Sequence, residues 1–196
     1  TYGYKAEKPA FGVLMHTMVN GVDGVQLPKG SGAALASTAT DFRTSELTET
    51  GRDQDYAIIG AGSFALYDPS TQEISRDGSF TVASFQEVNE EGEQETVWYL
   101  SDGEGRQVMN TEGYPIVVTD PTETQPVGAF LIQYQDGLQH AGSGRFLSGD
   151  KNGAVWISTS EVRQGVLESS NTDLAAELGK VIETQRAYSY VLRMVT

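Results

Sequence analysis

The apolar pattern that begins at residue 174 constrains this chain more than any other feature of its sequence. Side chains recur there at alternating steps of four and three residues, with one glutamine among them: Leu174, Leu178, Val181, Gln185, Tyr188 and Leu192. This spacing places one stripe along one side of an α-helix. Such a seam needs an apolar partner, which is either a second helix or the chain's own sheet, and the pattern alone favours neither.

The sequence carries a start signal for this helix but no stop signal. Ser170 or Asn171 can cap its N-terminus, with Asp173 in the favourable first turn. No proline or C-terminal glycine stops the pattern before the chain ends, and Thr1 to Lys5 carry no start signal of their own. We therefore expect a trimmed chain, with a partner helix upstream of Thr1 and the end of the C-terminal helix also outside it.

Composition excludes several classes of protein. Thirteen basic and 27 acidic residues give a formal net charge of −14, which argues against a nucleic-acid backbone or an anionic lipid surface as the main partner. No apolar run approaches the roughly 20 residues needed to cross a bilayer, so we expect no membrane insertion. The absence of cysteine excludes disulfides, thiolate metal sites and cysteine nucleophiles.

The sequence divides into three parts. Residues 1–48 are rich in small residues without helical periodicity and predict an extended arm with a few strands. Residues 49–160 predict a β-rich domain, because short β-prone runs alternate with turn signals such as Asp77-Gly78 and Asp102-Gly103. These runs are Tyr56–Ile59, Ser63–Tyr67, Ser79–Ala83, Val97–Leu100, Tyr114–Val118, Phe130–Tyr134 and Val155–Ser158. Residues 161–196 predict a return segment and a coiled-coil-type helix.

The predicted fold class is therefore mainly β. We expect a compact β domain of short antiparallel strands, with an extended N-terminal arm and a C-terminal amphipathic helix.

Three groups of motifs carry a family resemblance. The first is Thr1-x-Gly3-Tyr4-Lys5. The second comprises Gly51, Ala57-Ile-Ile-Gly60-x-Gly62-x-Phe64, Ser75-Arg76-Asp77-Gly78-Ser79-Phe80 and Gly113-Tyr114-Pro115. The third is Gly165-x-Leu167-Glu168-x-Ser170-Asn171, followed by Glu177, Ile182 and Thr184-Gln185-Arg186-Ala187-Tyr188. In this order the motifs resemble the flagellar rod and hook family, most closely its distal rod branch.

The chemistry of the second group is architectural. Gly60 and Gly62 can form a tight turn that delivers Phe64 to the core. In Arg76-Asp77-Gly78, the carboxylate can bond nearby amides while the glycine takes the left-handed conformation. Arg76 can form a salt bridge within or between subunits, although the block can equally be a stable turn and nothing more.

The resemblance implies a structural subunit of the flagellar basal-body rod. In the family, the C-terminal helix pairs with the N-terminal helix in the inner, tube-lining layer of the axial filament. The resemblance further implies helical assembly with copies of itself, contacts with other rod and hook proteins, and transmission of torque from motor to hook in motility. It also implies export by the flagellar apparatus across the inner membrane into the cell envelope.

Some alternatives stay open within this resemblance. Gln185 on the seam can fix the register of a helix pair and Arg186 flanks the seam, but both can also lie on a solvated edge. A proximal rod or hook subunit remains the alternative assignment, because residues 80–113 are longer and more acidic than the family pattern predicts.

The sequence predicts no enzyme and no catalytic, cofactor or metal site. His16 and His140 are the only histidines and lie outside any cluster with metal-ligand spacing. No nucleophile elbow or dinucleotide fingerprint is present. The alternative from another class is a secreted β-rich module that stacks carbohydrate on Trp98, Tyr99 and Trp156. Aromatic residues in strands are more often in the core, which is where we expect them.

Overall fold

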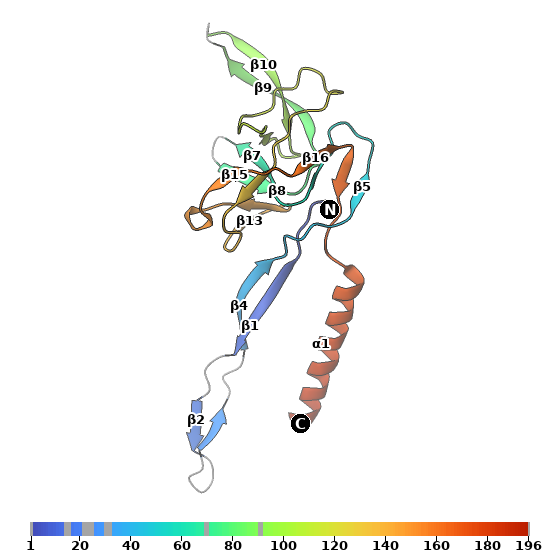
Figure 1. Cartoon of the computed structure of the whole chain (residues 1–196). Coiled ribbons are helices and arrows are strands. Elements are labelled where there is room, and N and C mark those ends of the chain that lie inside the picture. Colours follow the sequence, from blue (N-terminus) through green and yellow to red (C-terminus); the bar gives the residue numbers. More distant parts are fainter. Residues whose placement is uncertain are drawn as a thin grey trace. The chain divides into compact units, whose positions relative to one another are not determined.

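The chain consists of two compact units in the computed structural model, which describes residues 2–13, 17–20, 26–29, 33–68, 71–89 and 92–195 (Figure 1). One unit is Ala6–Phe42, and the other combines Thr1–Lys5 with Arg43–Thr196. Division by contacts thus gives two units, and the three-part division at residues 48 and 160 stays a prediction.

The smaller unit is built of antiparallel strand pairs. Strand β1 (Glu7–Val13) pairs with β4 (Ala33–Thr40), and the register shifts between Ala10 and Phe11. Strand β2 (Thr17–Asn20) pairs with β3 (Gln26–Lys29). Nζ of Lys8 in β1 donates a hydrogen bond of 2.6 Å to Oδ2 of Asp41, the residue that follows β4.

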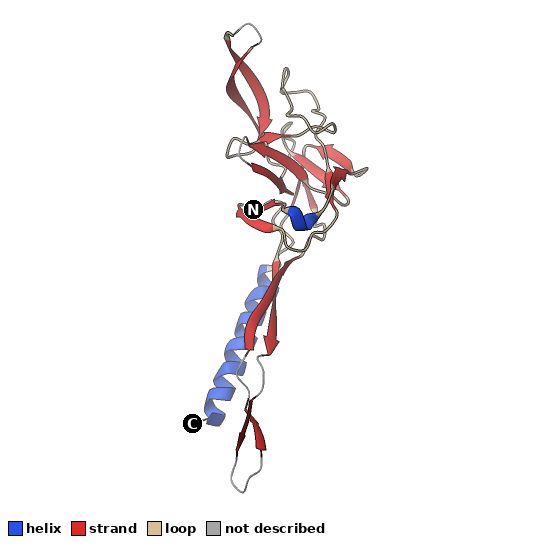
Figure 2. Ribbon diagram, turned by 90° about the vertical axis from the view of Figure 1, so that its left-hand side faces the viewer, coloured by secondary structure: helices blue, strands red, loops and turns tan. Residues whose placement is uncertain are grey.

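The larger unit contains a seven-stranded antiparallel sheet and three strand pairs, followed by a single long helix (Figure 2). The order across the sheet is β13 (Gln139–Gly142), β14 (Arg145–Leu147), β8 (Thr71–Ser75), β7 (Phe64–Asp68), β11 (Gln107–Val108), β10 (Gln94–Ser101) and β9 (Thr81–Val88). The pairs are β12 (Phe130–Ile132) with β15 (Val155–Ile157), β16 (Glu161–Gln164) with β6 (Tyr56–Ile59), and β17 (Val166–Glu168) with β5 (Leu47–Glu49). The short 3₁₀-helix η2 (Asp150–Asn152) and helix α1 (Leu174–Val195) complete it. The prediction of a mainly β chain with short antiparallel strands and a C-terminal helix is confirmed.

Six of the seven predicted runs overlap strands, and the exception has a local cause. Residues 114–118 form only isolated bridges, from Pro115 to Met109 and from Val117 to Tyr99. Proline has no backbone N–H to donate, so it interrupts a ladder of hydrogen bonds at this point.

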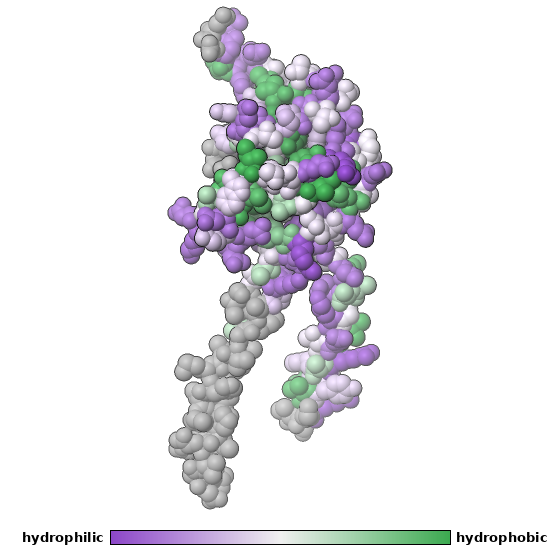
Figure 3. Space-filling model, viewed as in Figure 1, coloured by the Kyte–Doolittle hydropathy of each residue, from purple (hydrophilic) through white to green (hydrophobic). Residues whose placement is uncertain are grey.

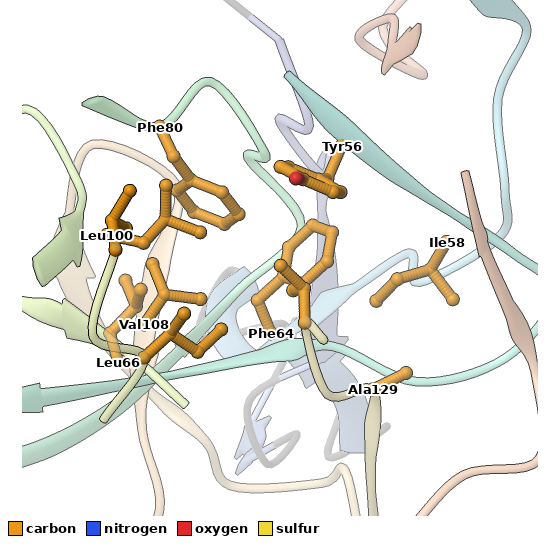
Figure 4. Close-up of a cluster of buried hydrophobic side chains, with 11 residues drawn as sticks. Tyr56, Ile58, Phe64, Leu66, Phe80, Leu100, Val108 and Ala129 are labelled. Atoms are coloured by element: carbon orange, nitrogen blue, oxygen red, sulfur yellow. The ribbon is translucent and has the colours of Figure 1, made fainter. Parts of the chain in front are cut away.

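The hydrophobic core is centred on Phe64 at the start of β7. Its side chain is fully buried and meets the ring of Phe80 edge-on, with 5.1 Å between ring centroids. Figure 4 shows Tyr56 and Ile58 on one side of this ring and Leu100 and Val108 among the side chains toward the other. The core therefore joins β6 and β7 to the segments that carry Phe80 and Leu100.

Gly78 lies beside this core, and its backbone conformation differs from the predicted one. The sequence predicts the left-handed conformation there, but Gly78 does not have a positive φ, so that prediction is wrong. The residue is glycine for a steric reason, because a Cβ atom at this position would lie 1.7 Å from the carbonyl oxygen of Tyr56. The Asp77 carboxylate does bond a nearby amide, accepting from the backbone N of Ser79 at 3.0 Å.

Gly78→Ala is expected to destabilise the larger unit by about 2–3 kcal/mol, since the backbone of β6 must shift to admit the methyl group. Gly103→Ala is the matched control: Gly103 also follows an aspartate in a turn, but its Cβ would meet open space and its φ is not positive. We expect that change to alter stability by no more than about 0.5 kcal/mol. Urea unfolding of both variants measures the difference, and equal losses would contradict the steric explanation.

Candidate functional site

The three motif groups meet in a buried cluster of charges. Lys5 comes from the first group, Arg76 from the second and Glu168 from the third. Nζ of Lys5 lies 2.6 Å from Oε1 of Glu168, and both side chains are at most 1% exposed. Nε of Arg76 donates to Oε2 of Glu168 at 2.7 Å, and its side chain is 3% exposed. One carboxylate thus holds two cations inside the protein.

Backbone contacts hold the first residues of the chain against the segment that leads into α1. The backbone N of Gly3 donates to the carbonyl of Glu168 at 2.7 Å, and that of Asn171 donates to the carbonyl of Tyr4 at 3.3 Å. Gly3 has φ +61°, and a Cβ there would lie 2.3 Å from the carbonyl carbon of Arg76. Glycine is therefore required both for its conformation and for the close approach.

Arg76 also ties the glycine turn of the second group to the cluster. Its guanidinium donates to the carbonyls of Gly60 at 3.0 Å, Gly62 at 2.8 Å and Ile58 at 3.2 Å. Gly60 and Gly62 have φ of +119° and +128°, which glycine adopts readily. The salt bridge of Arg76 lies within the chain, and the block is more than a turn.

The cluster keeps Glu168 ionised. Burial alone raises the pKa of Glu168, but the hydrogen bond from Lys5, the charge of Arg76 and the backbone N–H of Ser45 together hold that pKa below its usual value. Lys5 additionally donates to the carbonyl of Arg43 at 2.8 Å. The buried charged groups therefore have hydrogen-bond partners, and a satisfied polar network of this kind rigidifies the structure around it.

A second ion network lies on the seven-stranded sheet. Arg145 donates to Glu73 at 2.8 Å and to Glu104 at 2.5 Å, and Arg106 contacts Glu104 at 3.0 Å. Hydrogen bonds from Arg145 and Arg106 lower the pKa of Glu104 to about 2. A carboxyl group held ionised by two guanidiniums suits a structural network, whereas a general acid needs a raised pKa.

The cap of helix α1 lies two or three residues after the predicted caps. Asp173 is the capping residue, because its Oδ1 accepts from the backbone N of Ala175 at 2.9 Å and of Ala176 at 3.1 Å. The prediction of Ser170 or Asn171 as the cap is wrong. An aspartate directly before the first apolar residue satisfies the free N–H groups and the helix dipole together.

The seam of α1 lies at the surface. Its five apolar residues are 46–70% exposed: Leu174, Leu178, Val181, Tyr188 and Leu192. Gln185 and the flanking Arg186 are exposed as well. Figure 3 shows apolar side chains on the surface of α1 among hydrophilic ones. In the described part of the chain, every side chain from residue 174 to 193 is exposed, so the chain's own sheet does not cover the seam.

Lys5 and Glu168 belong to the first and third motif groups, but the sequence alone predicts no role for either residue. The signal that could have found them is the acid at the end of Val166-Leu167-Glu168, a short run that is buried throughout. A glutamate in such a run needs a cation beside it. Lys5 lies 163 positions away in the sequence, which no local pattern links to it.

The aromatic residues considered for carbohydrate stacking do not share one surface. Trp98 and Trp156 are 50% and 47% exposed, so the expectation that both lie in the core is wrong. Tyr99 is buried, its ring centroid lies 5.6 Å from that of Phe85, and its hydroxyl donates to Glu87 at 2.8 Å. Adjacent residues of a strand point to opposite faces, so Tyr99 cannot join Trp98 in one platform.

Histidines and carboxylates offer no metal centre among the described residues, where no group of three or more potential ligands was found. The ring of His140 packs on that of Phe146, with 4.5 Å between centroids, and His16 lies outside the described residues. No helix in the ranges described is long and apolar enough to span a membrane.

Known proteins that are similar to this chain support the family resemblance of its motifs. Residues 163–196 match the family described as flagellar basal body rod FlgEFG protein C-terminal. The chain is 30% identical to the flagellar basal-body rod protein FlgF of Caulobacter vibrioides, over 80% of this chain and 66% of that protein. It is 31% identical to the rod protein FlgG of Borreliella burgdorferi, over 81% of this chain and 66% of that protein. The chain belongs to the flagellar basal-body rod protein family.

A further relative in this family, FlgG of Buchnera aphidicola subsp. Baizongia pistaciae, is 28% identical over all of this chain and 84% of its own length. The chain spans 66% of the length of the Caulobacter and Borreliella relatives. Membership of the family makes this chain a structural rod protein of the flagellar basal body. Both FlgF and FlgG occur among the relatives, so their names do not separate the two types.

Proposed function

We propose that this chain is the structural core of a distal rod subunit that polymerises helically with copies of itself and transmits torque from motor to hook. The observation that carries the proposal is the exposed seam of α1 in a chain whose β domain is otherwise well packed. Most of the stability of a helix in a protein comes from packing of its apolar face, so the exposed seam of α1 calls for a packing partner. The proposed partner is the family's N-terminal helix, which would precede Thr1.

A polymer that carries torque needs a stiff connection between its helices and its β domain. The Lys5, Arg76 and Glu168 cluster lies at that connection, because Glu168 ends β17 and α1 begins six residues later. The same cluster fixes Gly3 and Tyr4 beside this segment. The first residues of the chain and the segment before α1 are thereby held together by one buried set of charges.

Assembly with other rod and hook proteins completes the proposal. Head-to-tail growth requires a heterologous contact that does not close on itself. We further propose that the protein reaches the cell envelope through the flagellar export apparatus and has no catalytic activity. A proximal rod or hook subunit is the alternative within the family.

The test is removal of the gene that encodes this chain, followed by electron microscopy of basal bodies and a motility assay, with the restored gene as control. We expect non-motile cells whose rods stop short and carry no hook. Rods that are complete but lack a hook would support a hook subunit, whereas a loss nearer the membrane would support a proximal rod subunit. Intact flagella and normal swimming would overturn the proposal.

A further inference from the structure

Helix α1 has two flanks outside its seam, and they differ in chemistry. One flank, called here the arginine flank, contains Ala175, Gly179, Ile182, Arg186, Ser189 and Arg193, at the same alternating four- and three-residue steps as the seam. The opposite flank, called here the acidic flank, contains Asp173, Glu177, Lys180, Thr184, Ala187 and Val191. A partner helix on the seam covers the seam and leaves much of both flanks exposed.

The two flanks carry opposite charge at opposite ends of the helix. Arg186 and Arg193 lie in the second half of the arginine flank, where they line a shallow groove with Ile182, Ser189 and Tyr190. Neither arginine has an acidic partner within the described part of the chain. Asp173 and Glu177 lie in the first half of the acidic flank, where Lys180 offsets part of their charge through its 2.7 Å contact with Glu177.

From this charge complementarity we infer that the arginine flank binds the acidic flank of α1 in a second copy of this chain. The inference rests on the proposed self-assembly and adds which faces meet. A contact between two different faces is heterologous, so it can repeat from copy to copy without closing into a dimer.

The positions of the charges also set an axial offset between neighbouring copies. Asp173 and Arg186 are thirteen residues apart, and Glu177 and Arg193 are sixteen residues apart. At a rise of about 1.5 Å per residue, a parallel neighbour displaced by roughly 20–24 Å brings both pairs together. With no displacement, each acidic first half lies beside the other copy's uncharged Ala175, Gly179 and Ile182, and the pairs are lost.

Charge reversal in the gene product that contains this chain tests the contact. One variant carries Arg186→Glu and Arg193→Glu, and a second carries Asp173→Asn and Glu177→Lys, in which asparagine keeps the helix cap. We expect each to lower the amount of this protein in isolated basal bodies at least tenfold. A chain with all four changes restores the pair of residues 177 and 193 with reversed sign, while the pair of residues 173 and 186 stays lost. We expect this chain to recover partly, to within about threefold of the unaltered protein.

Controls separate this contact from folding and from the proposed function. Lys151→Glu with Arg163→Glu is the control for the double arginine variant, because it makes the same charge change at exposed sites of the β domain. We expect it to leave incorporation unchanged. All purified variants should keep the melting temperature of the unaltered chain. Normal incorporation of both double variants, or failure of the four-change chain to recover, would overturn the inference. Absence of the unaltered protein from basal bodies would instead overturn the proposed function.

Discussion

Glu168→Gln is expected to destabilise the folded chain by about 3–5 kcal/mol. The carboxylate contacts both Lys5 and Arg76, and both cations stay buried after the change. An uncompensated buried charge costs far more than a missing surface pair. The melting temperature should fall by roughly 10 °C.

Two other substitutions show whether charge explains this loss. Lys5→Met leaves Arg76 paired with Glu168 in a neutral couple, so its cost should be clearly smaller than that of Glu168→Gln. Glu161→Gln is the surface control, because its side chain is 65% exposed and lies 3.6 Å from Arg163. We expect it to change stability by no more than about 0.5 kcal/mol. If Lys5→Met costs as much as Glu168→Gln, packing and not charge holds the cluster.

The pH dependence of stability follows from the same carboxylate. The pKa of Glu168 is lower in the folded chain than in the unfolded one, so the unfolded state binds more protons in acid. The stabilisation is complete above the unfolded pKa of about 4.3 and is lost as pH falls through the lower folded value. Urea unfolding between neutral pH and about pH 3 should show a steeper loss for the unaltered chain than for Glu168→Gln.

Features that depend on neighbouring residues were predictable from the sequence. The seam of α1 follows from a spacing of three and four residues, and most strands follow from short β-prone runs between turns. The cap was misplaced by a few residues because Ser170, Asn171 and Asp173 are all good capping residues. Choosing among them requires the actual path of the backbone.

Features that depend on distant residues were not predictable. Glycine is required at position 78 by the carbonyl of Tyr56 on strand β6, a distant contact that no turn rule predicts. The ion cluster joins Lys5, Arg76 and Glu168, which lie far apart in the sequence and which no local pattern links. The exposed tryptophans contradict a composition rule because the strands β10 and β15 turn those faces to solvent. In a rod protein such faces are candidates for contacts between subunits.

Val181→Asp is expected to abolish rod assembly and motility while leaving the isolated chain folded. The side chain of Val181 is 52% exposed in the middle of the seam, so the single chain loses little by the change. In the assembled rod, the proposed partner helix would bury that aspartate without a cation. Such a burial costs roughly 3–5 kcal/mol per helix pair, which is more than a hundredfold in an association constant.

Two further aspartate substitutions on α1 test whether the seam is the assembly contact. Leu178→Asp lies on the seam and should behave as Val181→Asp does. Ala176→Asp lies on the opposite side of α1, where we expect less than a twofold loss of swimming. Thermal unfolding of the purified chains should be unchanged for all three, since each position is exposed. Swimming cells with Val181→Asp protein in their rods would show that the seam is not the assembly contact. Equal failure of Ala176→Asp would show that α1 tolerates no added charge on any side, and the seam would lose its special role.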